Sequence, residues 1–380
     1  MKPTRRSAAV ITTIAATGAA VLAASGVLAA SASAAPNTSA NFSSSHSFIG
    51  PLHHTKVVAS TVPANGDVNP YGVAVVPRST GNLDRGDVLV SNFNNMANVQ
   101  GTGTTIVQVS PGGKAKLFAQ ISDKACPGGV GLTTALVALR GGWVIVGSLP
   151  TQNNGVISGP GCLIVLDQWG HVRSTIAGHG IDGPWDMTAL DQGNISELFV
   201  TNVLGGILGH HQNANGGTVQ RLVITSAQNR TPRVLASTTI GSGFPARTDP
   251  NALVIGPTGD GLGGNGTLYV ADTLNNRIAA IPDAVFRHSS DGPGRTVSKG
   301  GALLGELGLA IAPNGDILTV NGGNGNMVEV TPHGAQVAVV TVDNNSGGAG
   351  NLFGLAVKPG ARAVYFVDDF GSDNNLQLLF

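Results

Sequence analysis

Two cysteines and nine histidines are the side chains of this 380-residue sequence that most readily do chemistry. Cys126 and Cys162 can pair as a structural disulfide, or one of them can act as a thiol nucleophile if a histidine lies beside it. The histidines include the adjacent pairs His53-His54 and His210-His211. Side chains at neighbouring strand positions point apart, so we do not expect either pair alone to chelate a metal. The sequence has no Gly-x-Ser-x-Gly, His-Glu-x-x-His or phosphate-binding loop motif, so it predicts none of the sites built on them.

The charge balance argues against a nucleic-acid partner. The sequence has 21 basic and 21 acidic residues, and its basic residues do not cluster after Arg6. Binding to a phosphate backbone requires clustered cations, so we expect no nucleic acid among the partners. The hydrophobic fraction of 42% is large enough for a packed core, and 55 glycines favour many tight turns.

Residues 1–35 are predicted to be a secretory signal peptide. A basic start is followed by an uncharged, Ala-rich stretch over residues 8–30, and Ala32-Ser33-Ala34 then fits a cleavage site before Pro36. The alternative is an N-terminal membrane anchor, because the apolar stretch is long enough to span a bilayer. We favour the signal peptide and expect a secreted, extracellular protein with no membrane span in the mature chain. Residues 36–55 are rich in Ser and Asn and predict a flexible spacer.

A repeated pattern of apolar strands begins at Lys56 and continues to Phe380. Each copy has an inner strand of Gly-Leu-Ala-Val type, and the six copies are Tyr71–Val75, Thr133–Val137, Trp185–Ala189, Asn251–Ile255, Leu307–Ile311 and Phe353–Val357. Six copies with uneven loops predict an all-β, six-bladed β-propeller of four-stranded antiparallel blades over residues 56–380. The sixth copy lacks an outer strand, and Lys56–Thr61 has no partner in its own copy. We therefore expect this N-terminal strand to complete the last blade and close the ring.

This architecture places the two cysteines at the same end of one blade. Cys126 precedes the inner strand of the second blade, and Cys162 begins its third strand. An oxidising extracellular environment converts paired thiols to disulfides, so we predict a Cys126–Cys162 disulfide in preference to a catalytic thiol.

Residues 268–278, Leu-Tyr-Val-Ala-Asp-Thr-Leu-Asn-Asn-Arg-Ile, resemble the NHL repeat, whose core runs Leu-Tyr-Val-Ala-Asp and then Asn-Asn-Arg-Ile. Ser91–Asn95 and Asp368–Asn375 are partial copies of the same motif. The resemblance implies a six-bladed propeller. It implies little about activity, because folds of this type serve many functions.

Pro250-Asn251-Ala252-Leu253, followed by residues 268–273, is similar to a pair of motifs in the gluconolactonase / senescence-marker-protein family of metal-dependent lactonases. This resemblance implies that Asn251 is a ligand of calcium or another divalent metal at the channel mouth. The weaker metal candidates around the same ring are Asp186, Glu306 and Asp249. The chain departs from the family at Leu307, where the family has Asp. A divalent ion needs several converging oxygens, and the alternative is that Asn251 and Asp186 cap strands.

The first residues of the inner strands are expected to line the channel mouth. They are Tyr71, Thr133, Trp185, Asn251, Leu307 and Phe353. Large apolar side chains here can fill the narrow end of the channel, or they can form a shallow aromatic pocket for a sugar or an apolar ligand. We favour the packing role.

Two functions from different classes follow from these observations. The first is a monomeric extracellular module, without a cofactor, that binds a small molecule, a glycan or a protein. The alternative is a metal-dependent hydrolase or lactonase with its site at the channel mouth. A structural protein of the cell wall is a third reading. Clustering of the candidate oxygen ligands around one point would favour the lactonase, and their dispersal would favour the binding module.

Overall fold

The computed structural model describes residues 46–152, 156–157, 159–205, 213–249, 252–370 and 373–380. The predicted signal peptide, the first half of the predicted spacer, His210-His211 and Asn251 lie outside the described residues. Residues 42–380 form one compact unit. Among the described residues, no helix is both long enough and apolar enough to cross a membrane.

The compact unit is a six-bladed β-propeller, as the repeats predicted. Blades one and two contain β2 (Val68–Val75), β3 (Val88–Asn94), β4 (Thr105–Val109) and β5 (Ala115–Gln120), then β6 (Leu132–Ala138), β7 (Val144–Ser148), β10 (Cys162–Leu166) and β11 (Val172–Ile176). Blade three contains β12 (Pro184–Asp191), β13 (Ile195–Asn202), β14 (Asn213–Thr225), β15 (Val234–Asp249) and an added β16 (Leu253–Ile255).

The remaining three blades have four strands each. Blade four contains β17 (Pro257–Leu262), β18 (Leu268–Asp272), β19 (Arg277–Ile281) and β20 (Arg295–Lys299). Blade five contains β21 (Glu306–Ile311), β22 (Ile317–Asn321), β23 (Asn326–Val330) and β24 (Gln336–Thr341). Blade six contains β25 (Leu352–Val357), β26 (Val364–Asp368), β27 (Asn375–Leu379) and β1 (Thr55–Ser60). A small hairpin, β8 (Thr151–Gln152) with β9 (Val156–Ile157), and three short 3₁₀ turns at 123–125, 273–275 and 345–348 complete the elements.

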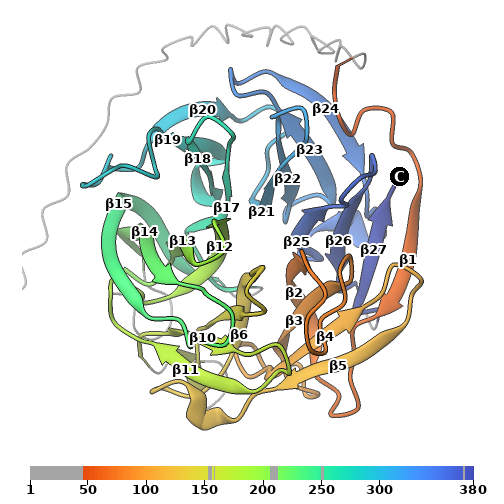
Figure 1. Ribbon diagram of the computed structural model, residues 1–380. Helices are drawn as coiled ribbons and strands as arrows, with labels where there is room; N and C mark the ends of the chain where they lie inside the picture. Colours follow the sequence, from red (N-terminus) through yellow and green to blue (C-terminus); the bar gives the residue numbers. More distant parts are fainter. Residues whose placement is uncertain (1–45, 153–155, 158, 206–212, 250–251, 371–372) are drawn as a thin grey trace, which may run out of the picture. The chain divides into compact units, whose positions relative to one another are not determined.

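The inner strands of the six blades surround a central channel. Figure 1 shows β2, β6, β12, β17, β21 and β25 at the centre of the ring, and each contacts the inner strand of the next blade. Apolar side chains from facing blades fill the space between them; Leu89 and Ile106 of blade one, for example, share a buried cluster with Val144 and Val146 of blade two. All six inner strands lose register with their second strand near their start, five of them just after the first paired residue and β2 after the second, Pro70. Such irregularities change the direction of side chains, and here they separate the channel mouth from the rest of the channel.

The N-terminal strand closes the ring, which confirms the sequence prediction. β1 pairs antiparallel with β27, with Lys56 opposite Leu378. The last apolar residues of the chain therefore have a partner strand, and Leu378 and Leu379 are buried. A sheet edge that would otherwise be open is paired within the same molecule.

The predicted inner strand of blade four was wrong. The described part of Asn251–Ile255 is β16, which pairs with β15 at the outer side of blade three, with Asp249 opposite Leu253. The inner strand of blade four is β17, whose sequence is Pro-Thr-Gly-Asp-Gly-Leu. Two glycines and a proline give this segment a low strand propensity of its own. Pairing with β18 and packing between β12 and β21 hold it as a strand.

Part of the predicted spacer is packed against the propeller. Phe48, Ile49 and Leu52 are buried in a cluster with residues of blades five and six. The carboxylate of Glu329 accepts hydrogen bonds from the backbone amides of Phe48 (2.5 Å) and Ile49 (2.8 Å). The expectation of a flexible spacer over 36–55 therefore does not hold for this stretch, because it carries apolar side chains that the blades can bury.

Cys126 and Cys162 form the predicted disulfide. Their Cα atoms are 6.0 Å apart, and the bond ties the segment before β6 to the start of β10. Both cysteines are buried, so neither is available as a nucleophile while the bond is intact.

Candidate functional site

The channel mouth is filled by large apolar side chains. Tyr71 stacks on Phe93 and on Phe353, with ring centroids 4.3 and 4.0 Å apart, and Trp185 lies 6.2 Å from Tyr71. Together with Leu307 they form one buried cluster, which also contains Leu149, Ile157, Val203, Leu204, Ala252 and Leu253 from the surrounding loops and β16. These side chains therefore pack against one another and do not form an open aromatic pocket, because no member of the cluster is more than 8% exposed. We call this group the aromatic plug.

The remaining mouth positions hold two buried threonines. Thr133 occupies the predicted position in blade two and is 4% exposed. In blade four the matching residue is Thr258 rather than Asn251, because Pro257 pairs with Asp272 as Pro184 pairs with Asn202 in blade three. Thr258 is buried, and its hydroxyl lies 3.1 Å from the backbone oxygen of Glu306. The mouth ring therefore contains aromatic, aliphatic and hydroxyl side chains and no carboxylate among the described residues.

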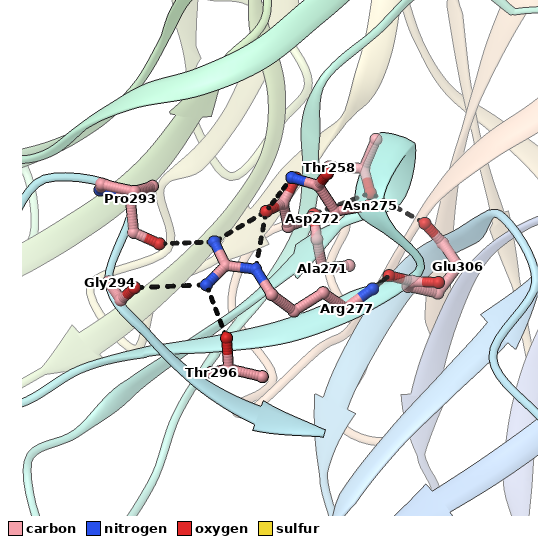
Figure 2. Close-up of polar contacts among 9 residues, drawn as sticks. All are labelled: Thr258, Ala271, Asp272, Asn275, Arg277, Pro293, Gly294, Thr296 and Glu306. Atoms are coloured by element: carbon pink, nitrogen blue, oxygen red, sulfur yellow. Dashed lines mark hydrogen bonds and ion pairs between the residues drawn. The ribbon is translucent and has the colours of Figure 1, made fainter. Parts of the chain in front are cut away.

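Glu306 is held by backbone contacts between blades four and five. Figure 2 shows its carboxylate against the backbone amide of Arg277, which donates a hydrogen bond to Oε1. Glu306 is fully buried, and desolvation raises the pKa of its carboxyl group from 4.5 to about 8. The neighbouring Arg277 partly offsets this rise. Glu306 thus holds a strand end in place and does not join Asp186.

Arg277 and Asp272, both part of the NHL-like motif, form the buried ion pair of the same network. The Arg277 guanidinium donates to Asp272 Oδ2 through Nε and Nη2, at 2.8 and 2.7 Å. It also donates to the backbone oxygens of Pro293 (2.8 Å) and Gly294 (3.2 Å), and Asn275 donates to Asp272 at 2.9 Å (Figure 2). The motif residues therefore hold one another, which is a structural role.

The described members of the predicted metal set, Asp186, Asp249 and Glu306, form no metal-binding group. Asp249 lies at the end of β15 and forms an ion pair with Arg247 at 3.0 Å, while Glu306 contacts Arg277 and Asn251 lies outside the described residues. Within the described part of the chain, no three His, Cys, Asp or Glu side chains lie close enough together to hold a metal ion. Calcium prefers six to eight oxygen ligands, and the side chains of the aromatic plug do not supply them. The described residues at the mouth therefore do not fit a calcium ion.

A central cavity of about 560 Å³ lies beyond the aromatic plug and is lined by the inner strands of all six blades. Its wall is formed by the later residues of these strands, among them the half-buried Val75, Leu262, Ile311 and Val357. Arg140 and Asp191 also line it, and the Asp191 carboxylate accepts a hydrogen bond from the backbone amide of Arg140 at 2.6 Å. The cavity thus combines an aliphatic wall with a few polar groups.

Asp186 and Asp260 line this cavity where blades three and four meet. Asp186 occupies a position that is glycine in four other blades, namely Gly72, Gly259, Gly308 and Gly354. A Cβ atom at Gly259 would point to the backbone of Leu307 and Leu309 in the next blade. By the same geometry the Asp186 side chain points to β17. Its Oδ1 accepts the backbone amide of Met187 at 2.8 Å, and the backbone of Asp260 lowers its pKa.

Asp260 lies on the side of β17 that faces blade three and is only 3% exposed. Neither of its carboxylate oxygens meets a hydrogen-bond donor of good geometry within the described residues. Desolvation, followed by repulsion from Asp186, raises the pKa of Asp260 well above its usual value, and the Thr188 backbone amide lowers it somewhat. Desolvation likewise raises the pKa of Asp186. Burial therefore favours the protonated form of both carboxyl groups, and repulsion from Asp186 adds to this at Asp260.

Sequence reasoning found Asp186 but missed Asp260. Asp260 lies in a Gly-rich run that reads as a turn, so its side chain had no assigned direction. One sequence signal could have found it: Pro70, Pro184 and Pro257 occupy the same register position of their inner strands. Aligning these prolines places Asp260 one residue beyond the Asp186 position in the neighbouring blade.

The sequence matches no protein-family model and no curated protein. Several solved structures share the fold. A gluconolactonase from Xanthomonas campestris superposes with a TM-score of 0.54 at 11% identity, covering 86% of this chain and 88% of that one. A luciferin-regenerating enzyme gives a TM-score of 0.52 at 10% identity, covering 86% and 94%. The calcium-binding protein regucalcin from Agrobacterium tumefaciens gives 0.50 at 13% identity, covering 84% and 92%. At these identities the chain is similar to gluconolactonase-like six-bladed propellers in fold.

Proposed function

We propose that this protein is an extracellular binding module that holds a small organic molecule in its central cavity. The observation that carries the proposal is the cavity itself, with the buried, unpartnered carboxyl group of Asp260 in its wall. Its volume of about 560 Å³ lies within the range of about 300–1,000 Å³ that is usual for small-molecule pockets. Most of its lining residues are apolar, as is usual in such a site, although the surface that they expose to the cavity is more polar than apolar.

The cost of burying Asp260 supports the same proposal. Burying a polar group without a hydrogen bond costs about 1–3 kcal/mol, and most such groups in folded proteins have partners. Thr134 also lines the cavity, is 3% exposed, and has no hydrogen-bond partner for its hydroxyl in the described part of the chain. A bound molecule with polar groups would satisfy both side chains.

Filling the cavity tests this proposal. Ala189 lines the cavity and is half-buried, so Ala189→Trp should occupy part of the space, while Ala189→Ser should leave it open. The probes are small apolar alcohols of graded size, from n-butanol to cyclohexylmethanol and 1-adamantylmethanol, with binding followed by ligand-observed NMR. We expect binding by the parent and by Ala189→Ser, and a loss of about tenfold or more in Ala189→Trp. Equal binding by the Trp variant, with its thermal unfolding unchanged, would place the ligand elsewhere and overturn the proposal.

Export is part of the proposed function. The disulfide between Cys126 and Cys162 is typical of proteins that fold in an oxidising compartment. Mass spectrometry of the protein recovered from culture medium should show loss of residues 1–35 and the mass of an intact disulfide. Recovery from the cytosol with the leader attached and both thiols reduced would contradict export.

A metal-dependent lactonase is the second candidate, and its support is the fold shared with the Xanthomonas campestris gluconolactonase. In this reading, calcium or another divalent metal would bind at the channel mouth. The aromatic plug supplies no carboxylate there, so we rank the lactonase second. Hydrolysis of an aldonolactone that is lost in Asn251→Ala would favour it over the binding module.

A further inference from the structure

Asp186 and Asp260 differ from neighbouring acids in having no basic partner. On the elements that pack against the pair, Glu197 forms an ion pair with Arg221 at 3.2 Å, and Asp272 forms one with Arg277. No Lys or Arg in the described residues contributes to the pKa of Asp186 or Asp260. Arg140 and Asp191 line the same cavity, where the Asp191 carboxylate accepts the Arg140 backbone amide, and Glu306 contacts the Arg277 backbone.

From this arrangement we propose that Asp186 and Asp260 anchor the protonated amine of an organic ligand whose apolar part lies against the aliphatic wall of the central cavity. This inference rests on the proposed binding function and names its ligand class. An ammonium group supplies both missing elements at once, since it carries a positive charge and up to three hydrogen-bond donors. Charge-assisted hydrogen bonds of this kind are about twice as strong as neutral ones.

The size and lining of the cavity favour an organic ammonium ion over a metal ion. A divalent metal needs several converging oxygen atoms, and the three carboxyl groups of this wall, on Asp186, Asp191 and Asp260, do not form such a group within the described residues. The half-buried Val75, Ile311 and Val357 would remain uncovered around a bare ion, whereas a hydrocarbon body would cover them. Arg140 lies at an exposed position, so the described residues leave the deep part of the cavity with net acidic character.

Binding of an amine should release protons. Burial disfavours the charged form of both carboxyl groups when no ligand is bound, and repulsion from Asp186 adds to this at Asp260. An ammonium ion favours the charged carboxylates, so its binding shifts the pair toward loss of a proton. Amine affinity should therefore rise with pH, until the free amine itself loses its proton near pH 10.

The test compares amines with alcohols of the same shape by titration calorimetry. Each probe is a pair: n-butylamine with n-butanol, cyclohexylmethylamine with cyclohexylmethanol, and 1-adamantylmethylamine with 1-adamantylmethanol. We expect the best amine to bind at least about tenfold more tightly than its alcohol. Repeating the titration in buffers of different ionisation enthalpy should show net proton release for the amine and none for the alcohol.

Asp260→Asn is the decisive variant, because it keeps the shape and removes the charge. It should reduce amine affinity to that of the alcohol and leave alcohol affinity unchanged. Glu306→Gln is the matched control, since it neutralises another buried acid that contacts Arg277 outside the cavity. It should leave amine affinity unchanged, and thermal unfolding of both variants checks that they are folded.

The possible outcomes separate this inference from the function on which it rests. Amine and alcohol binding equally, with both lost in Ala189→Trp, would overturn the amine anchor and keep the cavity as a binding site. Tight calcium binding that is lost in Asp260→Asn, without amine binding, would replace the ammonium by an inorganic cation and also overturn the inference. Failure of every probe at millimolar concentration would contradict both proposals.

Discussion

Blade four contains two buried acidic groups, and they differ in what surrounds the charge. Asp272, at the end of β18, pairs with the Arg277 guanidinium, and Glu306 of blade five accepts the Arg277 backbone amide (Figure 2). Asp260, on β17, lies near Asp186 of blade three, and no basic side chain in the described residues lies against either. Both sites carry the cost of removing carboxyl groups from water.

This difference separates a structural cluster from a candidate binding site. At Asp272, the chain supplies the opposite charge and the hydrogen-bond donors itself, so the network stabilises the structure around this acid. At Asp260, a basic partner is missing, and a cavity of about 560 Å³ lies beside it. Sites that retain buried charge without a protein partner are the places where a ligand is expected to supply one.

The largest effect should come from removing the cation that pairs with Asp272. Arg277→Ala leaves Asp272 buried and unpaired, and breaking a buried pair in this way costs about 3–5 kcal/mol of unfolding free energy. Urea unfolding at pH 7 measures the loss. Arg277→Lys keeps the charge but not the two-point contact with Asp272, so it should lose less. A loss below about 1 kcal/mol for the alanine variant would show that this network contributes no more than a surface pair.

The second effect concerns Glu306 and depends on pH. Because its pKa is raised from 4.5 to about 8, the folded protein keeps a proton that the unfolded chain loses, and stability falls as pH rises across this range. Glu306→Gln removes the dependence. We expect the variant to be more stable than the parent at pH 9 by on the order of 2–4 kcal/mol, with little difference at pH 4. Denaturant unfolding at both pH values measures this difference. If the unfolding free energy of the parent instead rises between pH 5 and 8 while that of the variant stays constant, the prediction is wrong.

Asp260→Asn should produce a smaller gain in the ligand-free protein. Because the pKa of Asp260 is raised in the folded protein, its charged carboxylate destabilises the fold at high pH. This destabilisation disappears when the pH falls below the usual pKa range of aspartate. We expect about 1–2 kcal/mol of added stability at pH 7 and less at pH 4. Asp84→Asn, at an exposed ion pair with Lys116, is the matched control and should change stability by less than about 0.5 kcal/mol. Destabilisation by Asp260→Asn at every pH would mean that the carboxylate has a structural partner.

The smallest effect should come from calcium at the plugged end of the channel. The aromatic plug presents no carboxylate in the described residues, so millimolar calcium should shift the melting temperature by less than about 1 °C. Asn251→Ala should behave like the parent. Stoichiometric calcium that disappears in this variant would return the lactonase to first place.

The propeller was predictable from the sequence because its signal is repeated. Six apolar inner-strand patterns and an unpaired strand at Lys56–Thr61 are sufficient to predict six blades and their closure, since each copy reinforces the others. The exception is blade four, where Asn251–Ile255 has the local composition of a strand and β17 does not. The conformation of β17 comes from its neighbours in the ring, which a local pattern cannot report.

The candidate site was only partly predictable for the same reason. Asp186 was named because it lies next to the expected mouth ring, while Asp260 was missed because its strand reads as a turn. The mouth residues Tyr71, Trp185, Leu307 and Phe353 belong to one buried cluster, and this mutual packing required the structure. Charge partners cannot be assigned from sequence alone, because Asp272 and Asp260 belong to the same blade and only Asp272 has an arginine beside it.

A crystal structure of the protein with cyclohexylmethylamine, at a pH near 8, tests the central claim most directly. The account predicts the amine nitrogen within hydrogen-bonding distance of the Asp186 and Asp260 carboxylates, with the ring against Val75, Ile311 or Val357 and the aromatic plug unchanged. Amine density among Tyr71, Trp185 and Phe353, with the central cavity holding only water, would contradict it.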